Sequence, residues 1–147
     1  MWNKARKAVL AASKESSIYI GADSVRFKKD DKWFARYATV IVVHKDSKHG
    51  CQVFHNVVTL PDYGQLRTRL MMEVQHSVEA FTAIEDVICG RKLEIHLDVN
   101  PDPKHASNLV ASEAAGWILG LGLTPKIKPE AWGASTAADY CARGRLN

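Results

Sequence analysis

The hydrophobic periodicity of the chain changes near Asp62, and this change constrains the fold more than any other feature. Before it, three segments rich in β-branched residues lie between turn-like stretches and predict strands over residues 17–23, 34–44 and 51–60. After it, mostly apolar residues recur at helical spacing, namely Leu66, Leu70, Val74, Ser77, Val78, Phe81, Ile84 and Ile88. The order predicts an antiparallel meander followed by a long helix that ends at Gly90.

The second half of the chain alternates strands and helices. Its predicted elements are a strand over residues 92–99, a helix over 106–121, a short strand over 124–129 and a terminal helix over 133–146. A short helix over residues 3–14 precedes the first strand. Since crossovers through helices join parallel strands, the chain predicts an α/β fold with a mixed five-stranded sheet flanked by helices.

The composition is that of a soluble globular protein, with 46% hydrophobic and 24% charged residues. Its 147 residues suit one domain, so we expect a single domain over residues 1–147 with residues 1–15 as an N-terminal helical extension. No apolar run approaches membrane-spanning length, and because the N-terminal residues lack a sustained apolar region we expect no secretory signal. Three widely spaced cysteines predict a reducing, cytoplasmic location. A net charge of +4 is compatible with nucleic acid as a partner without requiring it.

Two predicted strands end on a carboxylate, at Asp23 in the stretch IYIGADSV and at Asp98. Asp23 followed by serine is common in turns, but the ends of strands in α/β sheets are also where ligands gather. Glu73 lies about 20° around the helix from Leu66, seven positions earlier. It either reaches solvent at the edge of the apolar stripe or is buried and paired or bound to metal. Asp139 either complements the dipole of the last helix or joins the same cluster.

Taken together, the four carboxylates could meet at one end of the sheet. Clustered carboxylates repel one another, and their natural partner is a hard divalent cation. Two Mg²⁺ or Mn²⁺ ions about 4 Å apart would clamp a phosphodiester, activate water and stabilise the leaving oxygen. The carboxylate pattern therefore indicates a two-metal site.

The strand order and these acids resemble the ribonuclease H-like superfamily. There an Asp ends the first strand, a Glu lies on the first long helix, an Asp ends the fourth strand and an acid begins the last helix. The resemblance thus implies Asp23, Glu73, Asp98 and Asp139 as catalytic and metal-binding residues. The spacing SxxxD that ends at Asp139 is also similar to the last-helix motif.

A narrower resemblance extends from Ile18 to the last predicted helix. The stretches YIGADS, MMEVQHSVEA, IHLDVNPDPKHASN, GWILGLGLTPKIKP and ASTAAD occur in an order similar to that of the YkuK-like ribonuclease H-like proteins of bacteria and phages. Members of that family often carry Asp at the position of Glu130, which makes Glu130 the alternative fourth acid. We prefer Asp139 because it lies on the last helix.

Several other residues are candidates for contact with nucleic acid. Ser24 either caps a turn or, as the resemblance implies, lies beside the metals. Lys126 and Lys128 flank the last strand. His105 and Asn108 lie near a predicted helix start, where they either bind phosphate or cap the helix. His96 either orients a ligand or is a satisfied histidine beside the sheet.

A basic hairpin tip is a further candidate. Lys28, Lys29, Lys32 and Trp33 either follow a phosphate backbone or form a solvated turn, with Asp30 and Asp31 weakening the patch.

The functional hypothesis is a metal-dependent nuclease that cleaves nucleic acid, with RNA or an RNA–DNA hybrid as the expected substrate. The alternative is a nucleic-acid-binding module that keeps the ribonuclease H-like fold without turnover. No membrane association is expected. Self-association is left open by Trp117 and Leu119, which could face either a partner or the core.

Overall fold

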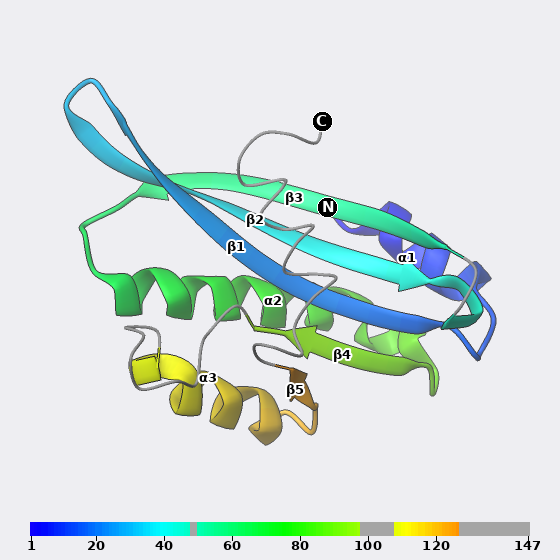
Figure 1. Ribbon diagram of the computed structural model, residues 1–147. Helices are drawn as coiled ribbons and strands as arrows, with labels where there is room; N and C mark the ends of the chain where they lie inside the picture. Colours follow the sequence, from blue (N-terminus) through cyan, green and yellow to red (C-terminus); the bar gives the residue numbers. More distant parts are fainter. Residues whose placement is uncertain (48–49, 98–107, 127–147) are drawn as a thin grey trace.

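The computed structural model describes residues 1–47, 50–97 and 108–126 (Figure 1). Its elements in chain order are α1 (Asn3–Ala11), β1 (Ser17–Lys29), β2 (Lys32–His44), the short 3-10 helix η1 (Lys45–Ser47), β3 (Cys51–Pro61), α2 (Leu66–Ile88), β4 (Lys92–His96), α3 (Asn108–Gly120) and β5 (Pro125–Lys126). The predicted order of strands and helices is confirmed over the described residues. The predicted terminal helix lies outside them.

The five strands form one mixed sheet in the order β3-β2-β1-β4-β5. β1 pairs antiparallel with β2, and β2 with β3, which gives the predicted meander. β4 pairs parallel with β1, and β5 with β4. The predicted mixed α/β sheet is therefore confirmed, with β1 as the strand that joins its antiparallel and parallel halves.

One face of the sheet carries the main core. Ile18 and Ile20 on β1 pack in one apolar cluster with buried residues of all three helices, including Val9, Ile84 and Ile118. The opposite face has a smaller buried set around Tyr19, made of Ala38, Val40 and Val42. The predicted alternation of β1 is thus confirmed, because odd and even residues belong to different clusters.

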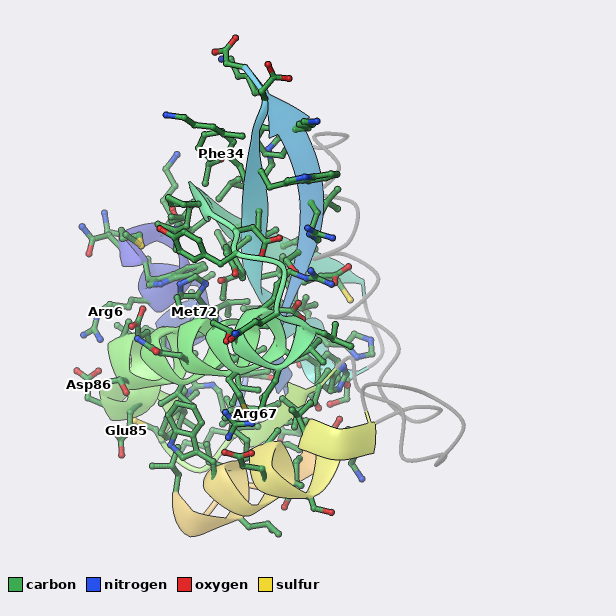
Figure 2. The ribbon with its side chains drawn as sticks, turned by 90° about the vertical axis from the view of Figure 1, so that its left-hand side faces the viewer. Arg6, Phe34, Arg67, Met72, Glu85 and Asp86 are labelled. Carbon is green, nitrogen blue, oxygen red and sulfur yellow. The ribbon has the colours of Figure 1, made fainter. Side chains whose placement is uncertain are left out.

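Polar contacts attach α1 to α2 at the far end of the core. Arg6 donates to the carbonyl oxygen of Ala83 at 2.8 Å and forms an ion pair with Asp86 (Figure 2). α2 ends with Cys89 in the left-handed conformation, followed by Gly90 at a φ of +81°. A non-glycine residue there would be strained, and the predicted helix end at Gly90 is confirmed.

The prediction that the first strand ends at Asp23 is wrong. β1 continues for six residues to Lys29, and Asp23 pairs with Ala38 in the middle of the ladder. The extension has its own cross-strand stabilisation, since Phe27 stacks on Phe34 with ring centroids 5.7 Å apart. Asp23 therefore does not initiate a turn.

The extension of β1 and β2 forms a hairpin arm, defined here as residues 25–36. It projects beyond the body of the protein at the end opposite α1 (Figure 1). Its tip is the two-residue turn Asp30–Asp31, in which both residues have positive φ, as in tight hairpin turns. The lysines predicted at the tip consequently lie within the strands.

Ile20 is the most informative position for testing the core. It is fully buried and pairs with Ile41 on one side and Ile95 on the other. We expect Ile20→Ala to lower the free energy of unfolding by about 2–5 kcal/mol. Thermal denaturation should show the midpoint falling by roughly 4–20 °C. Val53→Ala, at an exposed position of β3, is the control, and an equal loss in both variants would contradict this description of the core.

Candidate active site

The parallel pairing of β1 with β4 ends at Gly21 and His96, and Asp23 lies two residues beyond that point. Asp23 is partly buried and shares the face of Tyr19 and Gly21 by alternation. Its Oδ1 accepts a hydrogen bond from the backbone N–H of Ser24 at 2.8 Å. Its carboxylate is thus oriented locally, next to the place where the β1–β4 ladder opens.

Glu73 approaches this point from α2, on the other face of the sheet. Its side chain is only 7% exposed, so the buried interpretation is correct and the solvent-edge interpretation is wrong. The Ser24 hydroxyl donates to Glu73 Oε2 at 2.6 Å. A buried carboxylate is costly without such partners, and this charge-assisted bond accounts for part of its stabilisation.

A small cavity connects Glu73 with the end of β4. Its volume is 10 Å³, about the room needed for one water molecule. Its lining residues are Ala22, Leu70, Glu73, Val74, Ser77, His96 and Leu97. Glu73 therefore lies beside the end of β4.

Two carboxylates thus flank the opening between β1 and β4. Carboxylate oxygens are the ligands that hard divalent cations prefer, so Asp23 and Glu73 fit an Mg²⁺ or Mn²⁺ site in their chemistry. Within residues 1–47, 50–97 and 108–126, no group of three His, Cys, Asp or Glu side chains could hold a metal. The remaining predicted acids, Asp98, Asp139 and Glu130, lie outside the described residues.

Tyr37 and His76 extend the site on the α2 face, and neither residue was predicted from the sequence. Tyr37 pairs with Ser24 across the strands, and its ring meets that of His76 edge-on at 5.2 Å. Burial, together with the charges of Asp62 and Glu73, raises the pKa of the Tyr37 phenol. The alternation of side chains along β2 was the signal that could have identified Tyr37, because it places Tyr37 on the sheet face that α2 covers.

His76 makes the stability of this region sensitive to pH. Burial lowers the pKa of His76 below its ordinary 6.5, partly opposed by Glu79. The unfolded chain then binds more protons than the folded chain below about pH 6.5, so the free energy of unfolding should fall as pH decreases from 7.5 to 5.5. Denaturant titrations should show a flatter dependence in His76→Gln, whereas His55→Gln, at an exposed position of β3, should behave as wild type. Identical slopes in all three proteins would contradict this prediction.

His96 lies on the face opposite α2. It is buried, stacks on Tyr19 at 5.1 Å and has its Nε2 3.2 Å from a Glu94 oxygen. Burial lowers the pKa of His96. Burial opposes ionisation of Glu94, but the bond to His96 and the charge of Lys92 outweigh it and lower the pKa of Glu94. A neutral imidazole that donates a hydrogen bond to the Glu94 carboxylate fits the interpretation that His96 is a buried histidine with its hydrogen bonds satisfied.

The other predicted site residues are only partly described. Lys126 is half-buried in β5, next to His96 in the register, and its carbonyl oxygen accepts from the Leu97 N–H at 2.7 Å. Asn108 is the first residue of α3. His105 and Lys128 lie outside the described residues.

Two further predictions concern the surface. Trp117 and Leu119 are exposed on α3, and self-association stays a prediction. Cys51 and Cys89 are exposed free thiols, whereas Cys141 lies outside the described residues. In the part of the chain that the structure describes, no helix has the length and apolar character needed to cross a membrane.

Comparison with known proteins relates this geometry to a family. A family model described as Ribonuclease H-like matches residues 2–143. No curated protein matches the chain. Among solved structures, the chain is similar to the crystal structure of prototype foamy virus protease–reverse transcriptase, with 13% identity and a TM-score of 0.45. That similarity covers 90% of this chain and 21% of the viral chain, so this chain spans about a fifth of the viral protein's length.

Proposed function

Because the chain belongs to the Ribonuclease H-like family, we propose that it is a metal-dependent nuclease that hydrolyses phosphodiester bonds of nucleic acid. The observation that supports this most is the buried Glu73, 7% exposed, which accepts a hydrogen bond from Ser24, the residue after Asp23. A helix that served only to cover the sheet would gain more from an apolar residue at this position. A ligand role explains why an acid is kept there.

The proposed metal ligands are Asp23, Glu73, Asp98 and Asp139, with Glu130 as the alternative to Asp139. Asp98 directly follows Leu97, whose N–H bonds to β5. Two bound Mg²⁺ or Mn²⁺ ions would supply activation of the attacking water and stabilisation of the leaving oxygen.

The protein's own groups hold the carboxylates in place. The Ser24 hydroxyl donates to Glu73, and the Ser24 N–H donates to Asp23, so one residue orients both acids. Ser24 is therefore proposed as a positioning residue, in addition to its predicted role beside the substrate. Lys126, Lys128, His105 and Asn108 are proposed to contact the phosphate backbone of RNA or of an RNA–DNA hybrid.

The proposal also includes the narrower family, the extent of the domain and the cellular location. We infer kinship with the YkuK-like proteins from the motifs quoted above. We also propose that residues 1–147 form one domain, with residues 1–15 as an N-terminal helical extension. The cytoplasmic location rests on the odd number and wide spacing of the cysteines.

A cleavage panel tests the proposed activity. Labelled RNA–DNA hybrid, single-stranded RNA, single-stranded DNA, duplex DNA and a four-way junction would each be incubated with Mg²⁺, Mn²⁺ or EDTA. Cleavage of any substrate that requires the metal would support the nuclease and identify its substrate. Binding without cleavage under every metal condition would instead favour the inactive binding module.

A further inference from the structure

The hairpin arm is a basic, aromatic surface that the proposed chemistry does not use. Residues 25–36 carry five basic side chains, Arg26, Lys28, Lys29, Lys32 and Arg36, against two acidic ones at the tip, Asp30 and Asp31. The arm also carries Phe27, Trp33 and Phe34, the last of which is labelled in Figure 2. Interleaved cations and aromatic rings are the combination with which proteins bind single-stranded nucleic acid.

Trp33 is held in a fixed orientation although it is exposed. Its side chain is 45% exposed, and the Arg26 guanidinium lies over its ring, 4.5 Å from the centroid. Arg26 is in turn bound by Asp62, whose side chain is only 5% exposed. The Asp62 N–H also donates to the Trp33 carbonyl oxygen at 3.0 Å. Both the ring and the backbone of Trp33 are thus anchored to the connection between β3 and α2.

The charge around Trp33 lies on the face that leads to Glu73. Lys28 is the direct cross-strand partner of Trp33. Lys28, Arg26 and Ser24 share one face of β1 by alternation, and Ser24 contacts Glu73. The four residue steps from Lys28 to Ser24 span about 13 Å of strand, close to the length of four stacked nucleotides at about 3.4 Å each.

A pocket lies next to Asp62, the residue that anchors Trp33. Its volume is 370 Å³, and its walls include Tyr37, Leu60, Pro61, Asp62, Tyr63 and Met72. It shares Asp62 with the anchor of Trp33 and Tyr37 with the surroundings of Glu73. Its apolar and aromatic walls could accept a base next to the one at Trp33.

The residues around this ring, here called the Trp33 platform, are Arg26, Lys28, Trp33 and Asp62. We propose that the Trp33 platform stacks an unpaired base on the ring of Trp33 and directs a single strand along the arm toward Glu73. The inference rests on the proposed nuclease function and narrows its substrate to nucleic acid with a single-stranded segment. A duplex hides the faces of its bases in the stack, so it could use the cations but not the ring of Trp33.

The test is equilibrium binding in EDTA, with the full chain carrying Asp23→Asn so that no substrate is cut. The probes are a fluorescein-labelled single-stranded 12-mer, the same strand with abasic sites, and its duplex. Adding Trp33→Ala should weaken single-strand binding by about 5- to 150-fold, and should leave binding of the abasic strand and the duplex unchanged. Trp117→Ala is the matched control, since Trp117 is 38% exposed on α3 and should have no effect.

Fluorescence provides a second readout in conservative variants. The single strand should quench tryptophan emission in Trp117→Phe but much less in Trp33→Phe, because only Trp33 stacks on a base. Circular dichroism and the thermal midpoint check that each variant is folded. Unchanged affinity in Trp33→Ala, equal losses for single strand and duplex, or equal quenching in the two Phe variants would each overturn the proposal.

The outcomes separate this inference from the proposed function. Metal-dependent cleavage by the wild type, without any effect of Trp33, would leave the nuclease standing and refute the platform. Trp33-dependent binding without cleavage would support the platform and refute the nuclease.

Discussion

Replacing Asp23 by Asn should reduce metal-dependent cleavage by more than about 100-fold while the protein stays folded. Loss of even an outer partner of a metal ligand typically costs 10- to 100-fold, and this variant removes the charge of a proposed ligand itself. The amide oxygen of Asn can still accept the hydrogen bond from the Ser24 N–H. The local backbone should therefore be preserved, and the rate is measured on the best substrate of the cleavage panel.

Metal binding can be followed in the same variant without any substrate. A ligand that binds the folded state raises its stability by mass action, so Mg²⁺ or Mn²⁺ should raise the thermal midpoint of the wild type more than that of Asp23→Asn. Asp86→Asn is the control, since Asp86 lies near the far end of α2 and pairs with Arg6. Asp23→Asn would be purified free of metal and then assayed with added Mg²⁺ or Mn²⁺. Cleavage at the wild-type rate would refute the assignment of Asp23 as a metal ligand.

The fold could be predicted from the sequence because its signal is the spacing of apolar residues. The change from period two to helical period near Asp62 separates the meander from α2. The end of β1 could not be predicted in this way. Val25 and Phe27 lie among charged residues, and their strand conformation depends on cross-strand partners such as Phe34. The pairing of β1 with β2 decides where β1 ends, and this pairing cannot be recognised from the sequence of either strand alone.

The sequence predicts candidate site residues but not the contacts that those residues make. Glu73 was identified by its place near the apolar stripe of the helix, yet periodicity left both its burial and its exposure open. Only the packing of α2 on β1 and β2 decides this, since it brings Ser24 within 2.6 Å of Glu73. The contacts of Tyr37 with His76 likewise depend on tertiary packing.

The bond between Ser24 and Glu73 connects the fold to the proposed chemistry. Residues 17–22 of β1 are buried, and Ser24 follows them on the side of α2. A side chain at this position can reach the helix without entering the apolar core. The strand thus supplies Asp23 on one face and, through Ser24, a partner for the acid that comes from the other face. The dipeptide Asp23–Ser24 thus supplies one proposed acid and a hydrogen-bond partner for the other.

Glu73→Gln should therefore reduce cleavage more than Ser24→Ala does. Glu73→Gln removes the charge of a proposed ligand and should lower cleavage by more than about 100-fold, whereas Ser24→Ala removes only its hydrogen-bond partner and should cost about 10- to 100-fold. Both variants should also reduce the rise in thermal midpoint on addition of Mg²⁺ or Mn²⁺. Glu85→Gln, at an exposed position on the same helix (Figure 2), is the matched control.

A conservative variant distinguishes positioning from simple packing at Ser24. Ser24→Thr keeps the hydroxyl, and its β-branched side chain suits a strand, so it should recover most of the activity that Ser24→Ala loses. If Ser24 mattered only for packing, the losses in both variants would follow their thermal midpoints, and the response to added metal would not change. Wild-type cleavage in Glu73→Gln would remove Glu73 from the site, because a buried ligand that can lose its charge without consequence holds no metal.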